Sequence, residues 1–273
     1  MTRHRNPRSK TVTRADPATP KNTAVNSGAS DRQLRNVGLA RAISKMGYCS
    51  RSRAEEAVRA GRVRVNGAVR KNPEAPVHLG KDRVVIDGHE IKKAEKIYLM
   101  LNKPRGVVTS ASDERGRETI YSFLQKYKDG SWNWVAPVGR LDKASEGLLL
   151  ITNDSEWAAK ITAPETHVDK TYHVQIAEQA TLAMIEKLQH GLTVKDGEFL
   201  RVKSASVIRS GDRNCWLEIT LDEGRNRHIR RMFETIGIEV LRLIRVAIGA
   251  LKLGDLPKGK VRTLNEQEKA IVV

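Results

Sequence analysis

The sequence predicts an α+β protein. A mixed, largely antiparallel sheet is expected in its larger C-terminal region, and a pair of helices with a small sheet in its smaller N-terminal region. One supporting observation is that the apolar segments beyond residue 94 are short and mostly resemble strands. Another is that some of these segments are joined by tight turns, whereas others are separated by helical patterns. With 273 residues, 39% of them hydrophobic, the chain cannot be wholly disordered.

Residues 1–36 are predicted to be a disordered basic tail. They contain three prolines and many Ser, Thr and Asn residues, and no Leu, Ile or aromatic residue before Leu34, so they cannot form a core. A segment rich in Arg and Ser also fits an organelle transit peptide, but the missing apolar face and the two aspartates favour the tail.

Two short amphipathic helices are predicted next. Apolar residues at i, i+3, i+4 and i+7 from Leu39 onwards indicate a helix that ends at Gly47. In the second helix, Ser52 and Glu55 are predicted to form a capping box, and Gly61 ends the helix.

A small sheet should follow these helices. Val63 and Val65 alternate with arginines up to Asn66-Gly67, which is a strong signal for a hairpin turn, and a further strand is predicted over residues 83–88. Helices and strands together predict a separate small domain over residues 37–93.

A larger domain is predicted over residues 94–273. Its strands are expected at 97–101, 107–109, 147–152, 170–176, 201–208, 216–221 and 238–248, and its helices at 178–190 and 226–236.

The positive charge is concentrated towards the N-terminus. Of 49 Lys and Arg residues and 32 Asp and Glu residues, 21 basic but only 8 acidic ones lie within residues 1–93. Basic side chains that neutralise phosphates release counterions, so this asymmetry indicates a polyanionic partner. The alternative is a solvated basic face that serves solubility.

Several kinds of site are excluded or disfavoured. Two cysteines are too few for a disulfide framework or a zinc site, and the seven histidines lack metal-ligand spacing. Residues 254–260 have P-loop spacing, but Val261 stands where a magnesium-binding hydroxyl is needed. No apolar run approaches the ~20 residues of a membrane helix. We therefore expect a cytoplasmic protein with no metal, cofactor or membrane partner.

The first of these domains carries a resemblance to a known family. Its two segments Met46–Glu56 and Gly61–Gly67 resemble the alpha-L motif, a small RNA-binding module first recognised in a small-subunit ribosomal protein. Shape-based contact with RNA phosphates is therefore expected, although a solvated helix surface would show the same charges. The RNA-binding candidates in this domain are Arg41, Lys45, Arg51, Arg53, Arg62 and Arg64.

The segment Val138–Asp154 is the most distinctive segment of the larger domain. Asp142 lies in a predicted loop between two apolar stretches, and its neighbours Arg140 and Lys143 favour its anionic form. This carboxylate could act as a nucleophile or as a base. Taken alone, the pattern favours an aspartate that caps a turn and pairs with Arg140.

The full segment resembles the catalytic motif of pseudouridine synthases, in the branch that acts on ribosomal RNA and carries the alpha-L module. Further blocks agree in order, so that the resemblance covers about residues 37–265; they are Lys103–Gly106, Lys170–Val174, Glu223–Met232 and Leu243–Gly249. The resemblance implies an enzyme that detaches uracil from its ribose and rejoins it through carbon five, without cofactor or metal.

The resemblance also implies roles for particular residues. Asp142 would be the essential carboxylate, Tyr172 would pack against uracil and act as a base, and Arg230 would pair with Asp142. Arg140 would fill the space left by a flipped uridine. Contacts with phosphates are expected from Lys103, Arg105, Arg225 and Arg227.

The expected function is therefore conversion of a specific uridine in ribosomal RNA to pseudouridine, within rRNA modification and ribosome biogenesis. The partner would be ribosomal RNA or a pre-ribosomal particle, and the protein would be a monomer. One alternative is a non-catalytic RNA-binding assembly factor on the same scaffold. Another is a DNA-binding or coating protein, which the 4% aromatic content does not favour.

Overall fold

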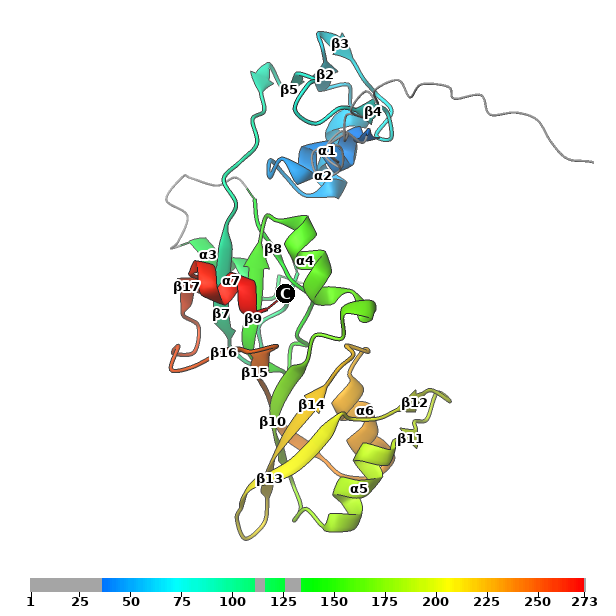
Figure 1. Ribbon diagram of the computed structural model, residues 1–273, viewed down its shortest axis with the longest axis vertical. Helices are drawn as coiled ribbons and strands as arrows, with labels where there is room; N and C mark the ends of the chain where they lie inside the picture. Colours follow the sequence, from blue (N-terminus) through cyan, green and yellow to red (C-terminus); the bar gives the residue numbers. More distant parts are fainter. Residues whose placement is uncertain (1–35, 111–115, 126–133, 273) are drawn as a thin grey trace, which may run out of the picture. The chain divides into compact units, whose positions relative to one another are not determined.

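The computed structural model describes residues 36–110, 116–125 and 134–272 (Figure 1). They belong to one compact unit, Asn36–Val273. Apart from Asn36, the predicted tail lies outside the described residues.

Two helices and a small antiparallel sheet form the N-terminal region of this unit. The elements are α1 (Leu39–Lys45), α2 (Arg51–Arg59), β2 (Val63–Val65), β3 (Ala68–Val69), β5 (Val84–Ile86) and β6 (His89–Glu90). The sheet order is β3-β2-β5-β6, and a separate pair joins β1 (Val37–Gly38) to β4 (Pro76–Val77). One cluster of buried aliphatic side chains holds these helices and strands together.

Tight turns set the register of the small sheet. Asn66 and Gly67 have φ values of 51° and 84°, and Asp87 and Gly88 have 50° and 84°. Two successive residues with positive φ are what a two-residue type I′ turn requires. The hairpin predicted at Asn66-Gly67 is confirmed.

The capping box predicted for the second helix is wrong. The hydroxyl of Ser50 accepts a hydrogen bond from the Arg53 amide at 3.3 Å, so the cap lies two residues before Ser52. Glu55 instead forms an ion pair with Arg51 at 3.3 Å, one helical turn away.

A nine-stranded mixed sheet forms the larger region of the unit. Its main order is β13-β14-β10-β15-β9-β7-β17, with β16 beside β15 and β8 beside β9, and β15–β9 is the one parallel pair among its described strands. This arrangement confirms the predicted α+β class with a largely antiparallel sheet. The strands are β7 (Tyr98–Lys103), β8 (Ala136–Pro137), β9 (Glu146–Thr152), β10 (Lys170–Ile176), β13 (Ser204–Ser210), β14 (Cys215–Leu221), β15 (Val240–Ile248), β16 (Leu251–Lys252) and β17 (Val261–Thr263).

Some predicted boundaries need correction. The strand expected over residues 107–109 is only an isolated bridge between Val108 and Thr119. The helix expected from residue 178 begins after Thr181, whose hydroxyl accepts a hydrogen bond from the Met184 amide at 3.2 Å. The helix expected from residue 226 begins after Arg227, whose φ of 48° is left-handed.

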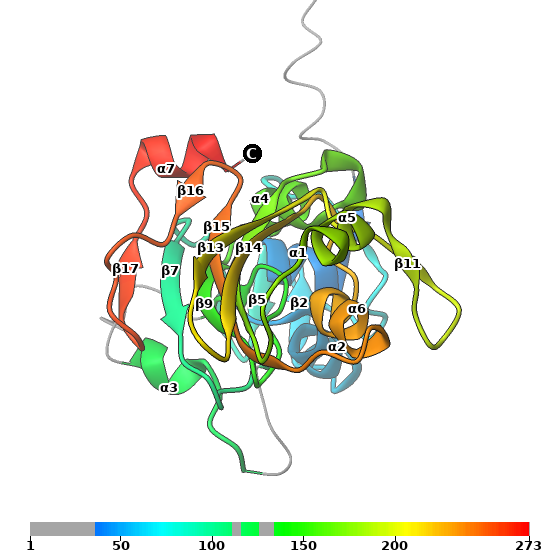
Figure 2. The same cartoon turned by 90° about the horizontal axis from the view of Figure 1, so that it is seen from below.

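The helices cover different regions of the sheet (Figures 1 and 2). They are α3 (Tyr121–Leu124), α4 (Ser155–Thr162), α5 (Leu182–His190), α6 (His228–Thr235) and α7 (Glu266–Ile271). Leu188 of α5 and Phe233 of α6 share a core cluster with Val174 of β10 and Leu217 of β14. This packing fixes α6 against the half of the sheet that contains β14 and β10.

Strand β9 is buried on both faces, as its uninterrupted apolar sequence predicts. Leu148 and Leu150 pack with Trp157 of α4, whereas Leu149 and Ile151 belong to a second cluster on the other side. A strand enclosed in this way is a rigid support for the loop that precedes it.

Gly147 allows β9 to run next to β15. Its φ is 101°, and a Cβ atom there would lie 2.3 Å from the carbonyl oxygen of Arg245. Only glycine tolerates both this conformation and such an approach. The close contact brings the loop before β9 next to strands β15 and β10.

Within the described residues, no helix is long and apolar enough to cross a membrane, and no cluster of His, Cys, Asp and Glu could hold a metal ion. Residues 253–260 connect β16 to β17 without the helix that follows a P-loop, so they form a turn rather than a nucleotide site.

Candidate active site

Asp142 lies in the loop between β8 and β9, and this loop is held through its backbone. Every carbonyl oxygen from residue 141 to residue 145 accepts a hydrogen bond. The donors are Thr109 Oγ1 to Leu141 (2.7 Å), Lys103 Nζ to Asp142 (3.1 Å) and to Ser145 (2.8 Å), the Gly106 amide to Lys143 (2.7 Å), and Arg230 Nη2 to Ala144 (3.0 Å). Donors from separate segments thus fix the position of Asp142 before any substrate binds.

Lys103, at the end of β7, is completely buried. Its ammonium group donates to the carbonyl oxygens of Pro104, Asp142 and Ser145, which uses all three of its protons. Burial lowers the pKa of Lys103 to about 8, although Asp142 and Glu146 oppose this shift. The expectation that Lys103 contacts RNA phosphate is therefore wrong, because the side chain is enclosed and supports the loop instead.

The side chain of Asp142 is half-buried beside a pocket of about 630 Å³. The walls of this pocket come from the loop 138–142, the start of β10, residues 221–229 and strand β15. Pockets of this size accommodate a single small molecule or one nucleotide.

Tyr172 enters the same pocket from β10 and is half-buried. It is paired across the sheet with Arg245 of β15 and Ile219 of β14. The structure therefore brings Tyr172 and Asp142 together, as expected.

Arg230 lies on α6 and is half-buried. Its guanidinium donates to the carbonyl oxygens of Ala144 (3.0 Å) and Val240 (3.1 Å), while its buried Nε has no partner among the described residues. Burial and Arg227 lower the pKa of Arg230, and the nearby Asp142 opposes this shift. The expected ion pair with Asp142 is not formed in this structure. Arg230 instead donates a hydrogen bond to the backbone carbonyl of Ala144, two residues after Asp142.

Three further expected residues lie on the exposed rim. Arg140 and Arg227 are exposed and line the pocket, and Arg227 has a left-handed backbone. Arg105 is also exposed and donates to the carbonyl oxygen of Leu241 at 3.3 Å. All of them keep a charge at the surface where a polyanion could meet it.

The site can now be compared with known proteins. The family described as RNA pseudouridylate synthase matches residues 97–235, and the S4 domain matches residues 37–84. A relative from Bacillus subtilis (strain 168), named ribosomal large subunit pseudouridine synthase B, is 35% identical over 84% of this chain and 93% of its own length. The chain belongs to the RNA pseudouridine synthase family.

Other comparisons agree with this assignment. A protein of Aquifex aeolicus named as an uncharacterized RNA pseudouridine synthase is 35% identical over 87% of this chain and 94% of its own length. A crystal structure of a pseudouridylate synthase superposes with a TM-score of 0.61 and 30% identity, covering 87% of this chain and all of that one. This pseudouridine synthase is thus an isomerase acting on uridine in RNA, which confirms the family, fold and enzyme class predicted from its sequence.

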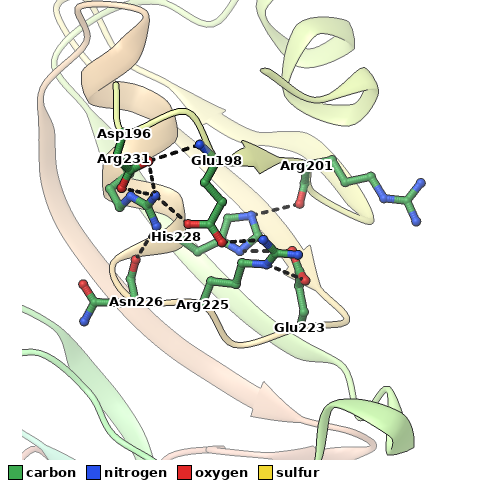
Figure 3. A network of polar contacts seen from close by, with 8 residues as sticks. All are labelled: Asp196, Glu198, Arg201, Glu223, Arg225, Asn226, His228 and Arg231. Atoms are coloured by element: carbon green, nitrogen blue, oxygen red, sulfur yellow. Dashed lines mark hydrogen bonds and ion pairs between the residues drawn. The ribbon is translucent and has the colours of Figure 1, made fainter. Parts of the chain in front are cut away.

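The pseudouridine synthase has an ion-pair network at one wall of the pocket that its sequence did not suggest (Figure 3). Strands β11 (Leu192–Thr193) and β12 (Phe199–Leu200) form a hairpin with Asp196 and Glu198 near its tip. Glu198 pairs with both Arg225 and Arg231, and Asp196 adds a second carboxylate for Arg231 at 2.6 Å. A turn containing Asp196-Gly197 was the available sequence signal for this hairpin.

The same network also involves Glu223 and His228. Glu223 pairs with Arg225 at 2.8 Å. The ring of His228 is buried, and its Nε2 lies 3.0 Å from the carbonyl oxygen of Arg201. Burial lowers the pKa of His228, which favours the neutral ring. Arg225 is therefore occupied by carboxylates in the free enzyme, so RNA would have to compete for it.

The predicted RNA-binding side chains of the S4 domain differ in their surroundings. Lys45 pairs with Glu156, Arg51 with Glu74, and Arg62 with Asp87, whereas Arg64 donates to the carbonyl oxygen of Gly67. Arg41 and Arg53 are exposed, and no ion pair involves either of them in the described regions of the chain. Those two are the cations most directly available to a phosphate.

Proposed function

We propose that this pseudouridine synthase acts on a uridine of ribosomal RNA and uses Asp142 as its essential carboxylate. The observation that carries this proposal is the fixed loop: five successive hydrogen-bonded carbonyl groups hold Asp142 beside a nucleotide-sized pocket that also contains Tyr172. The name of the Bacillus subtilis relative supports ribosomal RNA as the substrate class.

The reaction needs one carboxylate and no water. The bond between ribose C1′ and uracil N1 breaks, a bond between C1′ and uracil C5 forms, and the hydrogen on C5 leaves as a proton while N1 gains one. Asp142 either attacks the sugar or takes a proton from it, and Tyr172 packs against uracil and accepts the C5 proton. Arg230 supplies positive charge close to Asp142 while it holds the Ala144 carbonyl.

The uridine must leave the RNA stack to reach this pocket, which costs a few kcal/mol. Arg140 is exposed and lines the pocket, and in this proposal its side chain fills the vacated space. Exposed cations would contribute phosphate contacts that offset this cost; they are Arg41, Arg53, Arg105, Arg225 and Arg227.

The proposal also includes the domain boundaries, the role of the N-terminal tail, the oligomeric state and the compartment. The S4 domain would occupy residues 37–93 and the catalytic domain residues 94–273, preceded by a basic tail that strengthens binding to ribosomal RNA or a pre-ribosomal particle. The enzyme would work as a monomer in the cytoplasm.

The test uses ribosomal RNA labelled with tritium at uracil carbon five. Formation of the new bond expels this hydrogen, so tritium release reports the isomerisation directly. We expect release by the wild type without added metal or nucleotide, and none by Asp142→Asn. Asp255→Asn, an exposed aspartate in the loop between β16 and β17, is the matched control and should retain full release.

Binding of the labelled RNA is measured in parallel. If the wild type bound RNA but released no tritium from free RNA or from isolated ribosomal subunits, a non-catalytic assembly factor would be the better description. Release by Asp142→Asn would show that another group is the essential carboxylate.

A further inference from the structure

Arg245 is a buried arginine in the pocket for which the mechanism above has no use. Only 5% of its surface is exposed, yet it is one of the residues that line the pocket. Its Nε donates to the carbonyl oxygen of Leu148 at 2.8 Å, and its buried Nη2 has no hydrogen-bond partner among the described residues. A buried guanidinium with an unpaired N–H donor is destabilising unless a bound group accepts a hydrogen bond from it.

The sheet places Lys170 on the same face as Arg245. Arg245 of β15 pairs with Tyr172 of β10, and cross-strand partners share a face. Lys170 precedes Tyr172 by two residues, so it also lies on that face. The three side chains line one pocket, together with Asp142.

Lys170 and Arg245 also have in common that carboxylates lie near them without pairing with them. Neither forms an ion pair with a carboxylate in the described segments of the chain. The nearby Asp169 forms its ion pair with Lys203 instead, at 2.7 Å. Burial and the proximity of Arg245 lower the pKa of Lys170, and Asp169 and Asp222 oppose this shift. Two like charges held together in a half-buried pocket are stabilised when an anion lies between them.

We propose that Lys170 and Arg245 form an anion site that binds a phosphate group of the RNA next to the uridine that reacts. The proposal rests on the proposed function, because it takes the ligand of the pocket to be a nucleotide of RNA. Uracil and ribose are neutral, so the phosphate is the group of that nucleotide that carries the required charge. A guanidinium and an ammonium are both strong donors to phosphate oxygens.

Such a site would have a definite function in the reaction. A flipped nucleotide that is held by its phosphate has its ribose at a fixed distance from the Asp142 loop. Lys170 and Arg245 would thus be substrate-binding residues whose contribution appears mainly in affinity. The competing explanation is that both cations act only on the carboxylate of Asp142, which would change the rate of the chemical step instead.

The experiment measures tritium release from labelled ribosomal RNA by Lys170→Met over a series of KCl concentrations. We expect KM to rise at least about tenfold with kcat largely retained, because one charge-assisted contact is lost. Each phosphate contact contributes about 0.7 to 0.9 to the slope of log(kcat/KM) against log salt. The slope of Lys170→Met should therefore be smaller by roughly this amount.

Two further variants complete the design. Lys252→Met removes an exposed lysine of β16 outside the pocket and should change neither KM nor the salt slope beyond a general charge effect. Arg245→Lys keeps the charge in the site and should retain some of the affinity that Arg245→Met loses. A melting curve for each variant separates loss of binding from loss of folding.

A small-molecule measurement gives an independent readout. Uridine 3′- and 5′-monophosphate are tested as inhibitors beside uridine, and at least one of the monophosphates should inhibit the wild type more strongly than uridine does. This difference should disappear in Lys170→Met. An unchanged salt slope together with a fall in kcat, or equal inhibition by all three compounds, would overturn the phosphate site. Absence of tritium release by the wild type would instead contradict the proposed function itself.

Discussion

At the scale of single residues, Lys103 shows how a buried cation can serve structure rather than binding. The side chain is fully enclosed, and its ammonium group donates to three backbone carbonyl groups, of which that of Asp142 also accepts a hydrogen bond from the Ser145 amide. A neutral side chain of similar length would remove all three hydrogen bonds, and each buried carbonyl group left without any donor costs about 1–3 kcal/mol. Lys103 is therefore a structural support of the Asp142 loop.

Lys103→Met should reduce the free energy of unfolding, and the deficit should grow as pH rises. The pKa of Lys103 is lowered to about 8 in the folded protein, whereas an unfolded chain has the ordinary value near 10.5. Between these values the unfolded state binds more protons, so the wild type gains stability with rising pH, by at most about 3 kcal/mol.

Urea unfolding of both proteins between pH 7 and pH 10 measures this effect, because other titrating groups cancel in the comparison. Lys252→Met is the control, since an exposed lysine should leave the difference from wild type independent of pH. A constant difference for Lys103→Met would mean that burial does not lower this pKa.

At the scale of elements, the β11–β12 hairpin is attached to the pocket wall by charge. Its own strands have two residues each, which is too little for an independent hairpin. Glu198 pairs with Arg225, which precedes α6, and with Arg231, which lies in the first turn of α6; Asp196 also pairs with Arg231 (Figure 3). The hairpin and the start of α6 thus support each other.

Glu198→Gln should accelerate hydrogen exchange in the hairpin. The amides of Val194 and Gly197 form its internal hydrogen bonds, at 2.8 Å each, so they report its opening. The arginines hold the pKa values of Asp196 and Glu198 below their usual range. The ion pairs therefore stabilise the hairpin fully above about pH 4, and this stabilisation is lost as pH falls through the lowered pKa values of the two carboxylates.

We therefore expect faster exchange in the variant than in the wild type at pH 7, and a difference that shrinks as pH falls below about 4. Glu90→Gln, which removes an exposed carboxylate paired with Arg83 in the S4 domain, is the control. Equal exchange at pH 7 would show that the ion pairs do not hold the hairpin.

Elements with a complete local pattern could be predicted closely from the sequence. Strand β10 has the predicted bounds, because its apolar residues alternate with polar ones, and β9, a continuous apolar run, differs by one residue. The hairpin of β11 and β12 was missed, since its stability comes from arginines far along the chain. Helix α7 was also missed although Asn265 and Glu268 form a capping box that the sequence displays.

At the scale of the whole molecule, the distribution of charge should govern RNA affinity. Residues 1–35 contain eight basic and two acidic side chains, and the compact unit begins at Asn36. A chain of residues 36–273 should keep the kcat for tritium release and bind RNA more weakly, with a smaller dependence on salt. Replacing the tail by a neutral Gly-Ser segment of equal length is the control for chain length, and full affinity of the truncated chain would contradict this role.

The site could be predicted only incompletely. Asp142, Tyr172 and Arg230 could be predicted to lie in one region because they belong to ordered sequence blocks of the family, and the structure brings them together. The burial of Lys103 and the position of Arg245 depend on how β7, β9 and β15 meet at Gly147, a long-range contact that no local pattern encodes.

The Asp142 loop is fixed by groups outside it, and all of them bind its backbone. Every residue has a backbone carbonyl, so the identities of Lys143 and Ala144 contribute little to the position of this loop. These side chains are consequently free to vary without moving the carboxylate. Such positions are where an engineer could alter the choice of RNA while leaving the chemistry intact.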